Sequence, residues 1–157
     1  MLKKSLFIGI LIVQLFSNLW ADEKTINLNT LKTNNKQIMV FFHMNNCGYC
    51  NRMDKQTFQD FTIKQTIEKE FLMIDINIDE EIKITLNNKT YSARDFASYY
   101  EVHFFPTVIF LDDENEISYK ARGFRSVEKF QHILNFMKTK SFENMSFFEY
   151  LEEQDKE

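Results

Sequence analysis

Hydrophobic and polar residues alternate along the chain in blocks that predict a series of strands. Residues 38–44 form a nearly continuous apolar run, which is typical of a strand buried on both faces. Residues 71–78 predict a second strand, since apolar and polar types alternate near its end. Two more strands are predicted at residues 107–111 and 116–121, on either side of the acidic turn 112–115.

Helical patterns fill the gaps between these strands. They are predicted from Cys50 onward, over residues 61–70, from Ser92 to about Tyr100, from Ser126 to about Lys138, and after Ser146. Ser92 and Ser146 each precede an acidic residue by three positions, which is the pattern of a capping box. The alternation of strands and helices predicts one α/β domain, with a central mixed β-sheet flanked by helices.

Two segments do not follow this alternation. Residues 22–36 are polar and irregular, with at most one loose helix near residues 28–32. Residues 80–91 predict a small hairpin, with strands at 82–86 and 90–91 around an Asn-Asn-Lys turn. We interpret the hairpin as an insertion that decorates the edge of the sheet. The alternative is that it adds a rim to a binding groove.

Composition narrows the class of protein. The chain of 157 residues is 44% hydrophobic and carries 17 Phe, which is ample for a packed core. Its formal net charge of −4 disfavours a nucleic-acid partner, because nucleic-acid binders are usually basic. Only 3 Gly and 1 Pro occur, and no Gly-rich phosphate loop can be written with them. Two cysteines are too few for a disulfide scaffold but suffice for one redox pair or part of a metal site.

The N-terminus has the three parts of a secretory signal. Lys3 and Lys4 precede an apolar run over residues 6–16, and the short stretch up to Ala21 offers a cleavage site. The apolar run is shorter than the ~18 residues of a membrane-spanning helix. We therefore predict that residues 1–21 are a signal peptide and that the chain is sent to a bacterial periplasm. An uncleaved inner-membrane anchor that faces the periplasm is the alternative.

The chemistry concentrates in Cys47-Gly48-Tyr49-Cys50, where the first predicted strand turns into a helix. At such a junction, unpaired backbone N–H groups and the helix dipole favour a thiolate at Cys47. Cys50 lies one turn further on, close enough to attack a mixed disulfide formed by Cys47. Gly48 and Tyr49 complete the predicted site, and Gly48 is expected to let the turn tighten without a side chain in the way. An inert structural disulfide, or two buried thiols, is the alternative.

Residues 40–42 and the two cysteines resemble the first core strand and active site of the thioredoxin superfamily. The resemblance extends to residues 100–107, which are similar to the family's Tyr-x-Val-x-x-x-Pro-Thr segment. Residues 108–110 then match the following strand, and Gly123 matches the glycine before the last helix. The similarity covers about residues 36–140 and is greatest to the periplasmic SoxW-type thioredoxins.

The resemblance implies a thioredoxin-like fold in which Pro106 is cis and faces the two cysteines. An extended substrate could then pair with the backbone of Phe105 like an added strand. Phe104 and Phe105 would form an exposed apolar lip for unfolded substrates. An ordinary turn proline is the alternative for Pro106.

Departures from the family pattern change the expected site. Phe41 occupies the position at which thioredoxins bury an acid that helps to deprotonate the second cysteine. Asp75 stands where a lysine often faces that acid, and we hypothesise that its carboxylate, or a water molecule, replaces the missing one. The tryptophan that usually precedes the first cysteine is Asn46 here.

Two histidines open a different interpretation. His43 precedes Cys47 by four residues, and His103 precedes Pro106 by three. In this fold both can approach the cysteines, so His43, Cys47, Cys50 and His103 form an alternative two-Cys, two-His site for zinc or copper. The chain would then be a non-catalytic periplasmic metal carrier. His43 can instead tune the pKa of the thiols.

The resemblance implies a secreted thiol–disulfide oxidoreductase, most simply a monomer without a cofactor, in which Cys47 attacks protein disulfides and Cys50 resolves the mixed disulfide. We favour reduction over isomerase or oxidase activity, with electrons from a membrane donor of the DsbD or CcdA type. The thioredoxin-like domain is expected at residues 22–157, with its core at about 36–140 and a helical tail at 141–157. A thioredoxin-fold binding module without catalysis is the rival class.

Overall fold

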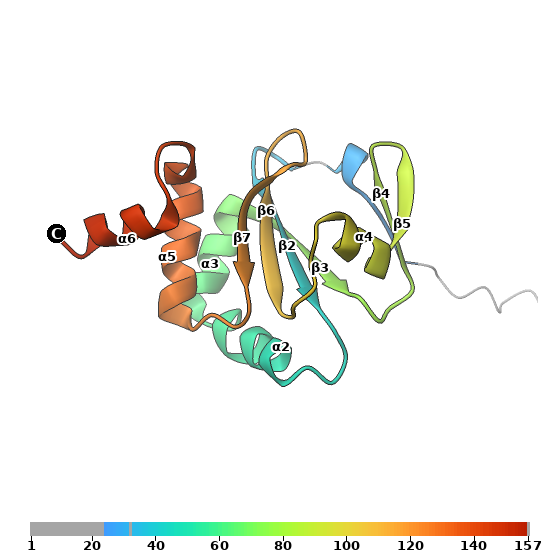
Figure 1. Ribbon diagram of the computed structural model, residues 1–157, viewed down its shortest axis with the longest axis horizontal. Helices are drawn as coiled ribbons and strands as arrows, with labels where there is room; N and C mark the ends of the chain where they lie inside the picture. The colour runs from blue at the N-terminus through green and yellow to red at the C-terminus, as the bar shows by residue number, and fades with distance from the viewer. Residues whose placement is uncertain (1–23, 32, 157) are drawn as a thin grey trace, which may run out of the picture.

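The computed structural model describes residues 24–31 and 33–156, so the predicted signal peptide lies outside the described residues. Within this part of the chain, the centre is a mixed four-stranded sheet in the order β3-β2-β6-β7, flanked by helices, which confirms the predicted fold class (Figure 1). Its strands are β2 (Gln37–His43), β3 (Phe71–Asn77), β6 (Thr107–Leu111) and β7 (Ile117–Arg122). Strand β2 runs parallel to β3 and antiparallel to β6, and β6 is antiparallel to β7.

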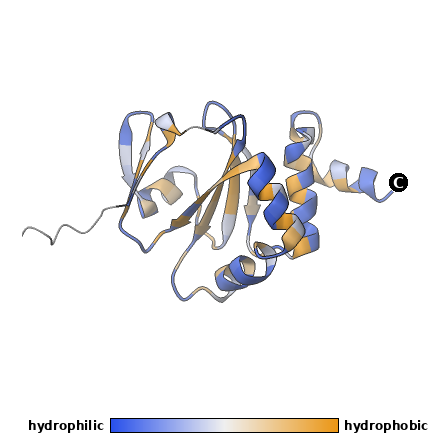
Figure 2. Cartoon of the chain, turned by 180° about the vertical axis from the view of Figure 1, so that it is seen from behind, coloured by the Kyte–Doolittle hydropathy of each residue, from blue (hydrophilic) through white to orange (hydrophobic). Residues whose placement is uncertain are grey.

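Helices cover both faces of this sheet. They are α3 (Phe61–Glu70) and α5 (Val127–Lys138) on one face and α4 (Ala93–Tyr99) on the other. Successive side chains of β2 point to opposite faces, so Met39 and Phe41 pack with α3 and α5, while Val40 and Phe42 pack with α4. Figure 2 shows the result, with hydrophobic central strands and helices whose polar residues face outward.

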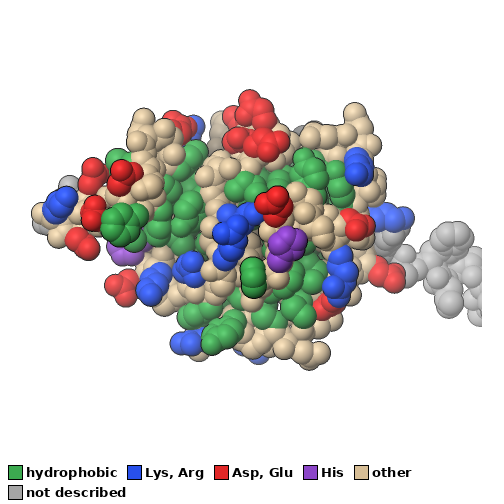
Figure 3. All heavy atoms as spheres, viewed as in Figure 1, with side chains coloured by type: hydrophobic (Ala, Val, Ile, Leu, Met, Phe, Trp, Pro, Cys, Tyr) green, Lys and Arg blue, Asp and Glu red, His purple; other side chains and the backbone are tan. Residues whose placement is uncertain are grey.

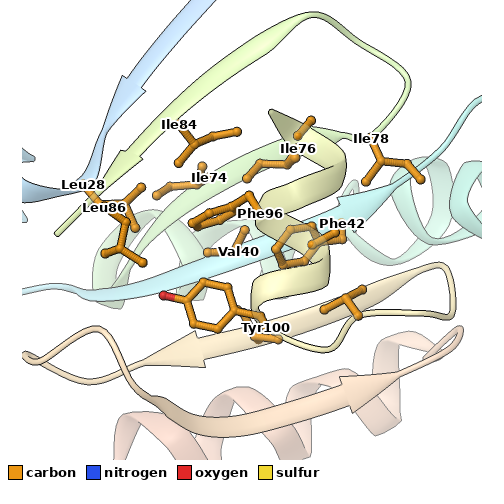
Figure 4. Close-up of a cluster of buried hydrophobic side chains, with 14 of the residues drawn as sticks. Leu28, Val40, Phe42, Ile74, Ile76, Ile78, Ile84, Leu86, Phe96 and Tyr100 are labelled. Carbon is orange, nitrogen blue, oxygen red and sulfur yellow. The ribbon is translucent and has the colours of Figure 1, made fainter. Parts of the chain in front are cut away.

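The core beneath α4 is a cluster of aliphatic and aromatic side chains. Phe96 of α4 is fully buried at its centre, among Val40, Ile74 and Ile76 (Figure 4). The ring of Phe96 also lies 5.9 Å from that of Phe42, centroid to centroid. This packing fixes α4 and the segment that follows it against the central sheet.

A second sheet closes the far side of this cluster. It has three strands in the order β1-β4-β5, namely β1 (Lys24–Asn27), β4 (Ile82–Leu86) and β5 (Lys89–Ser92). The hairpin predicted at residues 80–91 is present, but it does not decorate the edge of the central sheet. Ile82, Ile84 and Leu86 are instead buried in the core cluster, so the hairpin supplies one wall of the core.

Strand β1 corrects the prediction that residues 22–36 are irregular. It pairs in parallel with β4, from Lys24 opposite Ile82 to Asn27 opposite Thr85, and a single 3₁₀ turn (Leu28–Thr30) replaces the predicted loose helix. The sequence pattern hides this strand because its residues are mostly polar and its hydrogen-bond partner is distant along the chain.

The predicted tail forms helix α6 (Phe147–Gln154), and its capping box is confirmed. Ser146 accepts from the backbone N–H of Glu149, whose carboxylate accepts from the N–H of Ser146. Tyr150 packs on Phe136 of α5, with ring centroids 5.3 Å apart, so the tail belongs to the packed structure. None of the described helices combines the length and the apolar character needed to cross a bilayer.

Asparagine takes the place of glycine at most left-handed turn positions. Among the described residues, eight non-glycine residues have a positive φ, and six of them are Asn34, Asn35, Asn46, Asn87, Asn88 and Asn115. Asparagine tolerates this backbone region better than most other residues. The shortage of glycine in the composition therefore does not mean a shortage of tight turns.

Candidate active site

The two cysteines form a disulfide just beyond the end of β2. Helix α2 (Gly48–Arg52) follows directly and lies at the end of the sheet where β2 finishes (Figure 1). The two sulfurs are 2.05 Å apart, and the Cα atoms 5.2 Å. Cys50 is only 2% exposed, whereas Cys47 is partly exposed. An incoming thiol can therefore reach the sulfur of Cys47 far more easily than that of Cys50.

Cys47 is the N-cap of this helix. The backbone N–H of Cys50 donates to Sγ of Cys47 at 3.2 Å, and the N–H of Asn51 donates to the carbonyl of Cys47 at 3.0 Å. The helix thus begins at Gly48, earlier than predicted, and it widens into a π-turn over Met53–Thr57. The N–H of Cys50 is thus directed at the sulfur of Cys47, the more exposed of the two cysteines.

The residues between the cysteines differ from expectation in one respect. Apart from its chain neighbours and the backbone of its own helix, a methyl group at Gly48 would meet no atom within 4 Å, and the backbone there is not left-handed. The steric role predicted for this glycine is therefore wrong for the disulfide form. Tyr49 is 64% exposed, and its ring lies 6.3 Å from that of Phe124.

Polar residues at the end of β3 and just after it, together with Arg94 of α4, fix the loop that carries Cys47. The backbone N–H of Asn45 donates to Oδ2 of Asp79 at 2.9 Å, and the amide of Asn77 donates to Oδ1 of Asn45 at 2.8 Å. Arg94 of α4 forms an ion pair with the other carboxylate oxygen of Asp79. We call Asn45, Asn77, Asp79 and Arg94 the loop anchor. Sequence reasoning missed the loop anchor because its members are distant along the chain. A hint in the sequence is Asn77, a polar residue at the end of an otherwise mostly apolar strand.

His43 and Asp75 form a pair on the face of the sheet that also carries Phe41. Nε2 of His43 lies 2.8 Å from Oδ1 of Asp75, and the His43 ring stacks on Phe41 at 5.1 Å. The hydrogen bond to Asp75 raises the pKa of His43 above its ordinary value, against the opposite effect of partial burial; the charges of Glu80 and Asp54 also raise it. Asp75 itself is 61% exposed. Its carboxylate binds His43, one strand away from the cysteine loop.

The segment before β6 holds the proline singled out from the sequence. The Phe105–Pro106 bond is cis, and the carbonyl of Pro106 accepts a 2.7 Å hydrogen bond from the N–H of Gly123, whose φ is +80°. A left-handed φ of this kind explains why a glycine stands there. Phe104 is 68% exposed, but Phe105 packs against the core cluster beneath α4. Of the two phenylalanines expected to form an apolar lip, Phe104 is therefore the largely exposed one.

Phe124 connects this segment to the disulfide helix. It follows Gly123, and it contacts both Tyr49 and Arg52 of α2, with the Arg52 guanidinium 4.4 Å from its ring centroid. The hydroxyl of Thr57 further ties the π-turn to the carbonyl of Arg125 at 2.7 Å. Sequence reasoning did not single out Phe124, because one aromatic residue among 17 Phe carries no signal of its own.

The residues considered as a metal site do not converge. Over residues 24–31 and 33–156, no three His, Cys, Asp or Glu side chains are grouped so that they could hold a metal ion. His43 binds Asp75, His103 is exposed, and the two sulfurs are bonded to each other.

Comparisons with known proteins agree with this architecture. A family model described as a thioredoxin-like domain matches residues 26–138. A thioredoxin-fold protein from Helicobacter pylori is 22% identical, with a TM-score of 0.65 and 85% of each chain covered. A thioredoxin from Thermus thermophilus is 19% identical, with a TM-score of 0.55 over 74% of this chain and 88% of that one. At these identities the two structures show the fold alone. No curated protein sequence matches the chain significantly.

Proposed function

Since the chain belongs to the thioredoxin-like family, we propose that it is a secreted thiol–disulfide oxidoreductase that reduces disulfides of protein substrates. One observation carries the proposal: the cysteine pair is asymmetric, with Cys47 accessible and Cys50 2% exposed. Disulfide exchange needs an outer sulfur that can be attacked and an inner sulfur that is protected from other thiols. A purely structural disulfide has no need of this arrangement.

Reduction proceeds in two exchange steps. In the reduced protein, the Cys47 thiolate attacks one sulfur of the substrate disulfide; a bond forms between Cys47 and the substrate, the substrate S–S bond breaks, and the released thiolate takes up a proton. Cys50 then loses its proton and attacks Sγ of Cys47, which forms the internal disulfide and releases the second substrate thiol. Two electrons pass to the substrate, and exchange with a dithiol donor returns them.

The start of α2 supports the role of Cys47 as nucleophile. The N–H of Cys50 already points at Sγ of Cys47 at 3.2 Å in the oxidised protein. In the reduced protein the same donor would stabilise an anionic sulfur, as helix N-terminal groups do for other low-pKa cysteines. Cys50 is in place to resolve the mixed disulfide, since the two Cα atoms lie 5.2 Å apart.

Substrate contact is assigned to the surface around Tyr49, Phe104 and the Phe105–Pro106 bond. Tyr49 and Phe104 are among the large hydrophobic side chains that the described residues expose, at 64% and 68%. Exposed apolar side chains beside a reactive sulfur favour unfolded or extended substrates. Pro106 would present the backbone of Phe105 to such a segment.

The proposed setting is the periplasm, as for the SoxW-type thioredoxins that the sequence resembles. The support is the basic and apolar N-terminus, which predicts a cleaved signal peptide over residues 1–21. A membrane donor of the DsbD or CcdA type would keep Cys47 and Cys50 reduced in that compartment. The mature chain, residues 22–157, would act as a monomer with no cofactor.

Insulin reduction by the purified protein tests the proposal. Wild-type protein supplied with a dithiol donor should precipitate the insulin B chain, and Cys47→Ser should not. Cys50→Ser should instead accumulate a mixed disulfide, because the second exchange step is lost. Equal activity of wild type and Cys47→Ser would overturn the proposal and favour a binding module.

The reduction potential of the Cys47–Cys50 pair tests the direction of electron flow. A reductase should have a potential near the about −270 mV of thioredoxin, whereas an oxidase lies near about −120 mV and an isomerase near about −180 mV. The redox state of the pair in intact cells is the matching measurement, and a mainly oxidised pair would contradict a reductase.

A further inference from the structure

Arginine is rare in this chain, and its positions differ from those of lysine. The 19 basic residues comprise lysines spread along the whole sequence and only four arginines: Arg52, Arg94, Arg122 and Arg125. Arg94 belongs to the loop anchor. The other three lie on the opposite side of the disulfide, where α2, β7 and the loop before α5 meet.

These three arginines surround Phe124 and the proline segment. The Arg52 guanidinium lies 4.4 Å from the centroid of the Phe124 ring, and Nη1 of Arg125 donates to the carbonyl of Phe124 at 3.1 Å. Arg122 ends β7, opposite the residue that follows Pro106. We call Arg52, Arg122 and Arg125 the arginine rim. It borders the surface on which a substrate must sit to reach Cys47.

The charge of the arginine rim is not neutralised within the described part of the chain. The ion pairs found there join His43 to Asp75, Lys69 to Glu70 and Arg94 to Asp79. None of them involves a residue of the arginine rim. Arg52 and Arg122 are exposed, so their guanidinium groups can be reached from solution.

Lys120 extends this positive surface along β7. Its ammonium group donates to the carbonyl of Tyr100 at 2.7 Å. Burial lowers the pKa of Lys120, the charge of Arg122 lowers it further, and the charge of Glu101 raises it. Figure 3 shows Lys and Arg side chains gathered over β7, beside exposed hydrophobic side chains. These basic side chains lie together over β7 although the whole chain has a net charge of −4.

We propose that the arginine rim docks an acidic segment of the protein substrate, next to the substrate's disulfide; this inference rests on the proposed reductase function. The charges are complementary, and a guanidinium group holds a carboxylate through two parallel hydrogen bonds, which an ammonium group cannot do. Such contacts steer association, so they act on kcat/KM and weaken as salt is added.

The experiment compares three disulfide peptides of equal length, whose cysteines are flanked by Asp and Glu, by Asn and Gln, or by Lys. The full-length reduced protein should reduce the acidic peptide with a kcat/KM about fivefold above that of the neutral peptide, and the preference should vanish at about 0.5 M salt. Arg122→Gln should lower the preference about two- to threefold, and Arg122→Glu should reverse it. Lys64→Gln, which removes an exposed charge on α3, is the matched control and should leave the preference unchanged.

Equal kcat/KM values for the acidic and neutral peptides would overturn this inference and leave the reductase proposal intact. Failure to reduce any peptide would overturn the proposed function. In that case, NMR titration with acidic peptides in which serine replaces cysteine tests the docking separately from catalysis. Chemical-shift changes at Arg122 and Arg125 would support the docking, and the absence of such changes would overturn it. Binding to anionic vesicles without a preference for acidic peptides would assign the arginine rim to a lipid surface and also overturn the inference.

Discussion

The disulfide lies between two charged regions that are built in opposite ways. On the β3 side, His43 binds Asp75, and Asp79 binds both Asn45 and Arg94. On the β7 side, the Arg52 guanidinium meets the Phe124 ring and the amide oxygen of Gln56, and that of Arg125 meets the carbonyl of Phe124. None of the arginine rim takes part in an ion pair between described residues. The paired charges on the β3 side stabilise the fold, whereas the unpaired guanidinium groups on the β7 side remain available to a partner.

This difference separates two kinds of substitution. A change on the β3 side removes a hydrogen bond on which the cysteine loop depends, so it should lower the free energy of unfolding. A change in the arginine rim removes an exposed charge, so it should alter substrate preference and leave the fold intact. Each prediction below tests one side of this contrast.

The largest effect is expected for Asp79→Ala, which removes the acceptor of the Asn45 N–H and leaves Arg94 without its ion pair. The free energy of unfolding should fall by about 2 kcal/mol, because a hydrogen bond to a charged group is lost. Urea denaturation measures it, and insulin reduction should slow in parallel. Asp79→Asn, which keeps an acceptor for Asn45, is the control and should lose less. Unchanged stability in Asp79→Ala would show that this side does not anchor the loop.

Phe124→Ala should have the next largest effect, because the ring joins Tyr49 and Arg52 of α2 to the proline segment. Loss of a half-buried ring and its cation–π contact should cost about 1–2 kcal/mol of folding free energy. Phe124→Leu retains much of the apolar contact and should recover part of the loss. If Phe124→Ala were as stable as wild type, the contacts of Phe124 would not stabilise the fold, and the β7 side would differ from its surroundings only in its charge.

Asp75→Asn tests the pair on the β3 side through its pH dependence. Because Asp75 raises the pKa of His43, the pair stabilises the fold below the ordinary His43 value of 6.5, and this contribution disappears as the pH rises through the raised pKa. Wild type and Asp75→Asn should therefore differ most in thermal stability near about pH 6 and converge at higher pH.

The same variant tests the predicted link between Asp75 and the thiols. If the carboxylate acts on the cysteines, with or without His43, the pH profile of insulin reduction should shift in Asp75→Asn. An unchanged profile would remove Asp75 from the site and leave it as a partner of His43 only. His43→Gln offers a comparison in which the titrating ring is lost but a polar side chain remains.

The smallest effect on the fold is expected for Arg122→Gln. Exposed substitutions away from caps and buried contacts usually change the free energy of unfolding by less than about 0.5 kcal/mol. Urea denaturation of this variant should therefore overlay that of wild type, even where its substrate preference changes. A clear loss of stability would mean that Arg122 has a structural partner, and the contrast between the two sides would fail.

Local patterns in the sequence predict most of the fold. Residues 38–44 have the continuous apolar character of a central strand, and Ser126 and Ser146 cap helices as their sequence positions indicate. The two cysteines and Pro106 stood out because few other residue types serve at a redox turn or a cis bond. The strand, the helix caps and the redox turn depend on residues a few positions apart in the sequence. Sequence patterns are informative over this short separation.

The parts that sequence reasoning missed depend on distant partners. Asn45 and Asp79 meet only after β2 and β3 have paired. The residues next to Asn45 in the sequence therefore do not predict the loop anchor. Phe124 is one aromatic residue among many until Tyr49 and Arg52 are packed against it. The steric role expected of Gly48 was wrong because free space around a backbone atom is a property of the folded chain.

The pairing of β1 with β4 has a consequence for the order in which the protein folds. When the chain is synthesised from its N-terminus, β1 is the first of the described elements to emerge, yet β4, its sheet neighbour among the described strands, follows after β2, α2, α3 and β3. The second sheet, and with it the core under α4, cannot close until β4 has appeared. Such a non-local contact delays folding. The core beneath α4 is therefore completed only after more than half of the 157 residues have been made.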